Sequence, residues 1–234
     1  MSIALPAPDA PVASIAAAIA RMEAIGSALP PADGLGCFNR MYLDVTVQVN
    51  NRIGQGFFAD PAFMTELDVS FANLYFAAAD TDGTPAAVPP AWRPLVERRA
   101  TAGIEPVQFA LAGMNAHINH DLPLAVVSTC TALSTAPDAD SHHADYQKVD
   151  QLLDAADQSV RQSFENAAEL AADRHMAAVA NLIATWTINS ARDLAWNNCL
   201  LLWAMRDDPI ARGLFLDTLA TSTALASQML LVAV

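Results

Sequence analysis

The stretch that decides the fold is residues 108–135, QFALAGMNAHINHDLPLAVVSTCTALST, in which Asp121 carries the only formal charge. Two histidines, His117 and His120, stand beside it, and the other residues are uncharged and mostly apolar or small. A surface helix normally carries a charged face, so this pattern predicts a central and mostly buried helix over residues 105–134. A buried carboxylate must be paired, hydrogen-bonded or metal-bound, because burying a lone charge costs too much free energy. The same stretch is therefore the best candidate for a functional site.

Pro123 predicts a break in this helix beside its polar residues. Proline has no N–H to donate to the carbonyl of Asn119, so we expect a kink between Asn119 and Pro123. At 100° per residue the candidate site residues His117, His120 and Asp121 project to one face of the helix, which Gly113 and Leu124 share.

The rest of the chain also has the periodicity and the start signals of helices. Asp60-Pro61 and Asp208-Pro209 each place a capping carboxylate before a proline at the first helical position. We expect helices over residues 11–28, 37–53, 61–79, 90–101, 105–134, 143–172, 174–206 and 209–232. No strand-like alternation of useful length occurs. The sequence predicts an all-α, single-domain multi-helix bundle spanning residues 1–234, with a kinked central helix.

Composition narrows the class of partner. Of the 234 residues 53% are hydrophobic and 16% charged, and the formal net charge is −13. That charge argues against nucleic acid and anionic membrane surfaces as partners. Residues 214–234 are long enough to span a bilayer, but polar side chains interrupt them and favour a core helix. The scattered cysteines and an N-terminus unlike a signal peptide predict a cytoplasmic protein. The expected partners are a small-molecule substrate or apolar ligand and, as an open alternative, further copies of the chain in a homo-oligomer.

Two further aspartates lie inside apolar arcs of their helices. Phe71, Tyr75 and their neighbours flank Asp68, and Trp196 and Leu200 share the face of Asp193. The helix that carries Asp193 is apolar all round, so we expect Arg192 and Asp193 to enter the interior. Asp68 and Asp193 should each be buried and should contact a cation, a histidine or several donors.

The spacing of His117, His120 and Asp121 suits metal binding, since imidazoles and a carboxylate within one turn can ligate Zn, Fe or Mn. Asp68 or Asp193 would complete the ligand shell from another helix. Two alternatives stay open. One is a structural polar network in which Asp121 pairs with Arg192 or Arg40, and the other is metal-free catalysis with a histidine base oriented by a carboxylate. His142 and His143, near a helix start, are expected in a solvated loop.

Aromatic residues could line a ligand cavity. Trp186, Trp196 and Trp203 recur along one helix, which indicates either core packing or the wall of a cavity for an apolar molecule. The predicted substrate-binding residues are Arg40, Tyr75, Asn115, Asn119, Trp186 and Trp196, and the predicted catalytic residues are His117, His120, Asp121 and Arg192. Signatures of phosphate-binding loops, dinucleotide sites and H-E-x-x-H metalloproteases are absent.

Four blocks resemble those of an uncharacterised bacterial all-helical family: FNRMYL at 38–43, LDVSFANLYF at 67–76, AGMNAHINHDLP at 112–123 and ARDLAW at 191–196. The resemblance implies a helical fold and supports the choice of residues, and it supplies no reaction. The leading hypothesis is an intracellular enzyme of hydrolase or lyase type with a buried His/Asp site, with a divalent metal as its expected cofactor, acting on a small and partly apolar substrate. The alternatives are a non-enzymatic binding protein for an apolar molecule and a metal-free cyclase or isomerase with an aromatic cavity.

Overall fold

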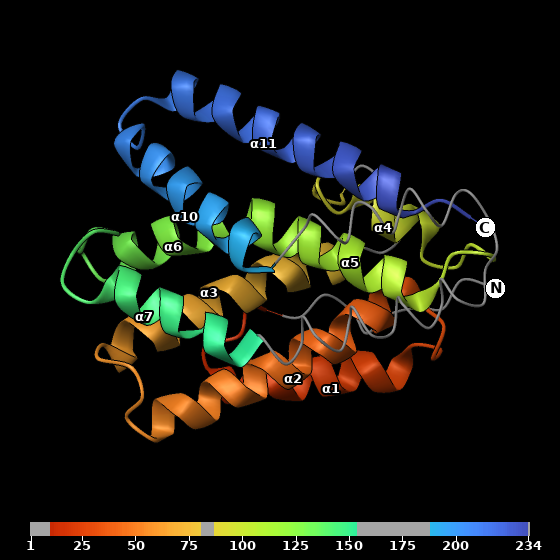
Figure 1. The fold of residues 1–234 in the computed structure, drawn as a ribbon, viewed down its shortest axis with the longest axis horizontal. Helices are drawn as coiled ribbons and strands as arrows, with labels where there is room; N and C mark the ends of the chain where they lie inside the picture. Colours follow the sequence, from red (N-terminus) through yellow and green to blue (C-terminus); the bar gives the residue numbers. More distant parts are fainter. Residues whose placement is uncertain (1–9, 81–86, 154–187, 234) are drawn as a thin grey trace.

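Helices account for every regular element in the computed structural model, which describes residues 10–80, 87–153 and 188–233 (Figure 1). In chain order they are α1 (Ile15–Ala28), α2 (Gly34–Gly54), α3 (Pro61–Ala79), α4 (Arg93–Arg98), α5 (Pro106–Ala116), the π-helical turn η1 (His117–Asp121), α6 (Leu122–Ala132), α7 (His142–Lys148), α10 (Ile188–Ala204) and α11 (Pro209–Leu230). The predicted all-α class is therefore confirmed.

Short polar side chains cap the starts of α1, α2, α3 and α11, where they accept hydrogen bonds from backbone N–H groups that no helical carbonyl can satisfy. Asp60 and Asp208 cap α3 and α11 at the predicted positions. Asp33 accepts from Leu35 and Gly36, so α2 begins at Gly34 rather than at residue 37. The helix predicted over 90–101 is only the six-residue α4, which follows turns at residues 90–92. Parts of the helices predicted over 143–172 and 174–206 lie outside the described residues.

The α5–η1–α6 segment runs through the middle of the molecule (Figure 1). α5 packs against α2 and against α11, and α6 packs against α3 and α10. Every residue from 107 to 118 is buried except the partly exposed Ala110. The prediction of a central, mostly buried helix is confirmed, and the helices around it explain why that stretch carries so little charge.

The α-helical hydrogen-bond pattern of the central segment is interrupted by a π-helical turn at His117–Asp121, next to the stretch where a kink was predicted. Leu122 donates its backbone N–H to the carbonyl of His117, five residues earlier rather than four. Pro123 follows immediately and has no N–H to offer to Asn119. Single π turns inside α-helices are frequent at functional sites, since they change the directions in which successive side chains project. This turn consists of His117, His120, Asp121 and the two residues between the histidines.

Close packing of α2 on α5 depends on Gly113. A Cβ atom at this position would lie 2.5–2.6 Å from the Cβ, Cγ and Cδ2 atoms of Phe38. Since the clash involves the root of the side chain, the two helices would have to move apart. We expect Gly113→Ala to lower the free energy of unfolding by about 1–3 kcal/mol, measured by urea denaturation. Gly213→Ala, in α11 with nothing within 4 Å, is the control and should be neutral or slightly stabilising. Equal stabilities of the two variants would contradict this account of the packing.

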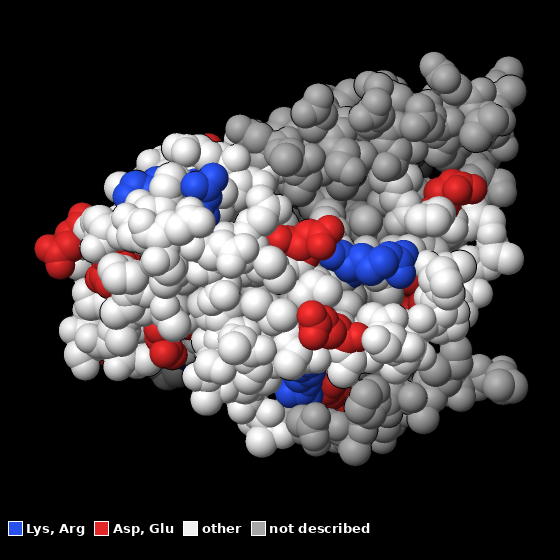
Figure 2. Space-filling model, turned by 90° about the horizontal axis from the view of Figure 1, so that it is seen from below, with Lys and Arg blue, Asp and Glu red and all other residues white. Residues whose placement is uncertain are grey.

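On the face drawn in Figure 2, the coloured acidic and basic side chains are sparse and interspersed, without a broad basic patch. None of the described helices is long and apolar enough to cross a membrane.

Candidate functional site

Asp121 is the centre of a buried hydrogen-bond network. Its Oδ2 atom lies 2.8 Å from Nε1 of Trp92 and 3.0 Å from Nδ1 of His117, and its Oδ1 atom lies 2.7 Å from Nδ1 of His120. Asp121 is only 2% exposed. Burial by itself raises the pKa of this carboxyl, but the hydrogen bonds from His117 and His120 outweigh it and hold the pKa below its usual value. Asp121 is therefore a carboxylate that orients two imidazoles.

His117 is held in one orientation by aromatic rings as well as by Asp121. Its ring stacks on Phe71, with centroids 3.5 Å apart and planes 4° apart, and it meets Tyr42 edge-on at 4.4 Å. Burial lowers the pKa of His117, although Asp121 acts in the opposite direction. The imidazole is thus neutral near pH 7, and we assign its proton to Nδ1 because a carboxylate accepts there. Nε2 is then an acceptor, and it has no hydrogen-bond partner among the described residues.

A cavity of about 80 Å³ adjoins this imidazole. This volume is the space open to the centre of a water-sized sphere, and one water needs roughly 10–15 Å³ of it. The cavity can therefore hold several waters or a small molecule. Among the described residues the wall is almost entirely apolar, with the rings of Phe38, Tyr42, Phe71 and Tyr146 and aliphatic side chains from α2, α3, α5 and α10. The charged or basic members of this wall are Asp68, His117 and Arg192.

Asp68 faces the same cavity from α3. The residue is 8% exposed, which confirms the prediction of burial. Its Oδ2 atom has no hydrogen-bond partner among the described residues, so the prediction of a cation or donor at this atom is wrong within that part of the chain. Burial raises the pKa of Asp68 to about 7. The carboxyl therefore exists in both protonation states at neutral pH. The hydroxyl of Tyr42 is also buried without a partner in the described ranges.

Arg192 enters the interior as predicted, but it pairs elsewhere. Its Nε donates to Asp150 and its guanidinium lies 4.1 Å from the ring centroid of Tyr146, whose backbone carbonyl it also binds. It contacts the cavity with its charge already compensated. The alternative that Asp121 pairs with Arg192 or Arg40 is wrong, because its carboxylate is hydrogen-bonded to Trp92, His117 and His120 instead.

Asp193 is exposed, so the prediction of its burial is wrong. α10 buries Ile188, Ala191, Arg192, Ala195, Trp196, Asn198, Cys199 and Leu202, and this face turns Asp193 outward. The helix also exposes Leu194 and Leu201, at 53% and 50%. Apolar residues therefore lie on both sides of α10. The prediction relied on Trp196 and Leu200 as neighbours of Asp193, but Leu200 is itself 37% exposed. Asp193 is therefore separated from the cavity that Asp68 and His117 share.

The predicted substrate-binding residues are mostly engaged away from the cavity. Arg40 is exposed and donates to the carbonyl of Pro31. The Tyr75 hydroxyl donates to Asn39. Asn115 donates to α11, at Thr223 and Ser227, and accepts from Asn119. Trp196 packs against His143 and Tyr146 without lining the cavity, and Trp186 lies outside the described residues.

The predicted metal ligands do not converge on one point. Within the described ranges, no three His, Cys, Asp or Glu side chains are placed to hold an ion together. The physical reason is that His117 and His120 both turn Nδ1 towards Asp121. The carboxylate is therefore hydrogen-bonded to the two imidazoles instead of binding a metal ion together with them. His117 reaches the cavity, whereas His120 does not line it.

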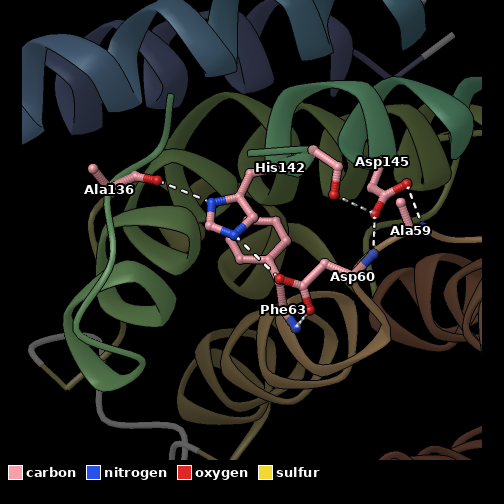
Figure 3. Close-up of polar contacts among 7 residues, drawn as sticks. Ala59, Asp60, Phe63, Ala136, His142 and Asp145 are labelled. Atoms are coloured by element: carbon pink, nitrogen blue, oxygen red, sulfur yellow. Dashed lines mark hydrogen bonds and ion pairs between the residues drawn. The ribbon is translucent and has the colours of Figure 1, made fainter. Parts of the chain in front are cut away.

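A second polar cluster surrounds His142, which is buried rather than in the solvated loop expected from the sequence (Figure 3). The ring stacks on Phe63 at 4.0 Å, Nδ1 lies 2.9 Å from the carbonyl of Ala136, and Nε2 lies 3.4 Å from Asp60. Asp145 is 0% exposed and accepts from the backbone N–H groups of Ala59 and Asp60. The bond to Ala136 ties α7 to the loop before it, and the other contacts tie α7 to the start of α3, so we interpret the cluster as structural.

Sequence reasoning missed Trp92, which donates to Asp121 from the turn before α4. It also left Phe38, Tyr42 and Phe71 as ordinary core residues, although they surround His117 and line the cavity. These three rings lie in two of the blocks that carried the family resemblance, FNRMYL and LDVSFANLYF. Their position in these blocks was the one sequence signal that could have marked the three rings as part of the site. Nothing in the sequence around Trp92 indicated its role.

Comparison with known families places the chain in one of them. The family described as "Family of unknown function (DUF5995)" matches residues 15–233, so the chain belongs to this family. Comparisons with curated proteins and with solved structures gave no significant match.

Proposed function

Since membership of the DUF5995 family assigns no reaction, we propose from the site itself that the protein is a metal-free acid–base enzyme, of lyase or isomerase type, for a small and largely apolar substrate. His117 is the general base, Asp121 orients it, and the aromatic cavity holds the substrate. The observation that carries the proposal is the buried Nε2 of His117, which lacks a partner in the described residues and belongs to a ring that lines the cavity. Its Nδ1 is bound to a carboxylate.

This arrangement suits proton abstraction because each part has a separate task. The Asp121 carboxylate fixes the tautomer that leaves Nε2 free, and it stabilises the imidazolium that forms when Nε2 takes a proton. The apolar wall excludes water from the base. Because burial lowers the pKa of His117, the imidazole is unprotonated at neutral pH and ready to act. Asp68 faces the same cavity as a second group that can bind or move a proton.

Incorporation of deuterium tests the proposal without knowledge of the natural substrate. The protein is incubated in D₂O with small branched ketones such as 4-methylpentan-2-one and with their amino- and hydroxy-substituted analogues. We expect exchange of the C–H beside the carbonyl for at least one compound, and at least about 100-fold slower exchange in His117→Gln, because glutamine can donate to Asp121 but cannot act as a base. Proton NMR measures both rates.

His143→Gln is the matched control, since His143 is exposed and stacks on Trp196 without lining the cavity. It should exchange at the wild-type rate. Equal rates in His117→Gln and wild type, or no exchange with any compound, would contradict the proposed function. The latter result together with tight binding would favour the second candidate, a binding protein, which the almost wholly apolar wall also suits.

A divalent metal remains a separate prediction of the sequence. A metal ion bound by His117 Nε2 and Asp68 would need a further ligand from outside the described residues, because no three described His, Cys, Asp or Glu side chains are placed to hold an ion. Elemental analysis of protein purified without chelators would test it. A stoichiometric Zn, Fe or Mn content that is lost in His117→Gln would replace the metal-free proposal.

A further inference from the structure

The cavity presents two hydrogen-bond acceptors without a partner in the described part of the chain, Oδ2 of Asp68 and Nε2 of His117. The hydroxyl of Tyr42 also lines the cavity without a partner there, but it has one proton to donate and carries no charge. When ionised, Asp68 is also a buried negative charge without a compensating cation at that atom. Acceptors and a carboxylate left in an apolar wall are costly unless a bound molecule brings donors and positive charge.

No described basic side chain supplies that positive charge. Arg192 is the arginine that lines the cavity, and its guanidinium is committed to Asp150 and to the backbone carbonyl of Tyr146. Lys148, on the neighbouring α7, binds Asp145 at 2.7 Å and the carbonyl of Phe57. Within the described ranges, the positive charge opposite Asp68 is therefore left for the ligand.

We propose that the cavity binds a small aliphatic amine as its ammonium ion, with the ammonium donating to Asp68, the alkyl group among the rings of Phe38, Tyr42 and Phe71, and Nε2 of His117 left free to take a proton. This inference rests on the proposed function, whose substrate class it names. Aromatic rings add to the attraction, because their electron-rich faces favour cations over neutral groups. The net charge of −13 draws cations towards the protein and repels carboxylates.

The alternatives fit the same wall less well. A carboxylic acid would bring a second negative charge beside Asp68. An alcohol can donate to one acceptor only and leaves the charge of Asp68 uncompensated. A purely apolar molecule would cover both acceptors without giving either a donor.

The protonation state of Asp68 links amine binding to pH. Five titratable or charged groups face it or its near neighbours: Tyr42 on α2, His117 on η1 with Asp121 behind it, Tyr146 on α7 and Arg192 on α10. Burial raises the pKa values of both tyrosines and lowers that of His117, while Arg192 is paired. Asp68, whose pKa is about 7, is therefore the group that changes charge at neutral pH. The ammonium needs its carboxylate form, so amine affinity should be about tenfold lower at pH 6 than at pH 8.

Calorimetry with three probes of the same carbon skeleton tests the proposal on the full chain: 3-methylbutylamine, 3-methylbutan-1-ol and 3-methylbutanoate. At pH 8 the amine should bind at least about tenfold more tightly than the alcohol, and the carboxylate should not bind. Asp68→Asn should lose at least tenfold in amine affinity and change little towards the alcohol. Asp193→Asn, an exposed carboxylate outside the cavity, is the matched control and should bind as wild type does. Circular dichroism verifies that each variant is folded.

The inference is overturned if amine and alcohol bind equally, if the carboxylate binds best, if none of the probes binds, or if Asp68→Asn keeps full amine affinity. These outcomes are distinct from failure of the proposed function. His117→Gln should still bind the amine through Asp68 while losing deuterium exchange. If neutral ketones exchange deuterium and amines are not preferred, the role of His117 as a base is supported and the proposal of an amine ligand is contradicted.

Discussion

Replacing Asp121 with alanine is expected to lower the free energy of unfolding by roughly 3–5 kcal/mol at pH 7. The change removes the acceptor of Trp92 Nε1, of His117 Nδ1 and of His120 Nδ1, and it leaves these donors in a site where Asp121 is 2% exposed. Each unsatisfied buried donor costs about 1–3 kcal/mol, and water can reach the partly exposed His120 most easily. Urea denaturation followed by circular dichroism measures the loss.

Asp217→Ala provides the comparison, because Asp217 is an exposed aspartate in α11. Its effect should stay within about 0.5 kcal/mol. A loss below about 1 kcal/mol in Asp121→Ala would mean that the network does not stabilise the central helix. That result would contradict the structural role of Asp121, whatever the activity of the variant.

Replacing Asp68 with asparagine is expected to have the opposite sign and to stabilise the protein by roughly 2–4 kcal/mol at pH 8. The pKa of Asp68 is about 7 in the folded protein and near 3.9 in the unfolded chain. Folding therefore favours the protonated carboxyl, and stability that is present below pH 4 is lost as the pH rises towards 7. Asparagine is never ionised and avoids this loss.

The test is the difference in unfolding free energy between wild type and Asp68→Asn, measured from pH 4 to pH 8. The difference should be small at pH 4 and should grow up to about pH 7, where it levels off. Other titrating groups are common to both proteins and cancel. A variant that is less stable than wild type at pH 8 would show that the carboxylate is satisfied in the free protein, and it would remove the reason for a cationic ligand.

The central helix was the feature best predicted from the sequence. A long apolar stretch whose one charge is Asp121 is stable in water only when it is buried. Pro123 removes a backbone hydrogen bond inside that helix, so an irregular turn beside it also follows from local chemistry. The capping aspartates Asp60 and Asp208 are local signals of the same kind. The burial of Asp68 was predicted because polar residues mark the other side of its helix.

The arrangement of the site needed three-dimensional information. Both faces of α10 are apolar, so periodicity could not tell which one is buried, and Asp193 was placed on the wrong side. Trp92 reaches Asp121 across 29 residues of sequence, and no local pattern encodes that contact. The spacing of His117, His120 and Asp121 suggested shared metal ligands, whereas the π turn lets both imidazoles bind the carboxylate instead.

The central claim is that His117 is a neutral base with its proton on Nδ1 and a free Nε2, and nitrogen NMR of the imidazole tests it most directly. In ¹⁵N-histidine-labelled protein, the His117 signals should show a protonated Nδ1 and an unprotonated Nε2 at pH 7 and at pH 8, because burial lowers the pKa of this ring. Loss of the His117 signals in His117→Gln assigns them. A proton on Nε2, or a doubly protonated ring at pH 7, would contradict the account.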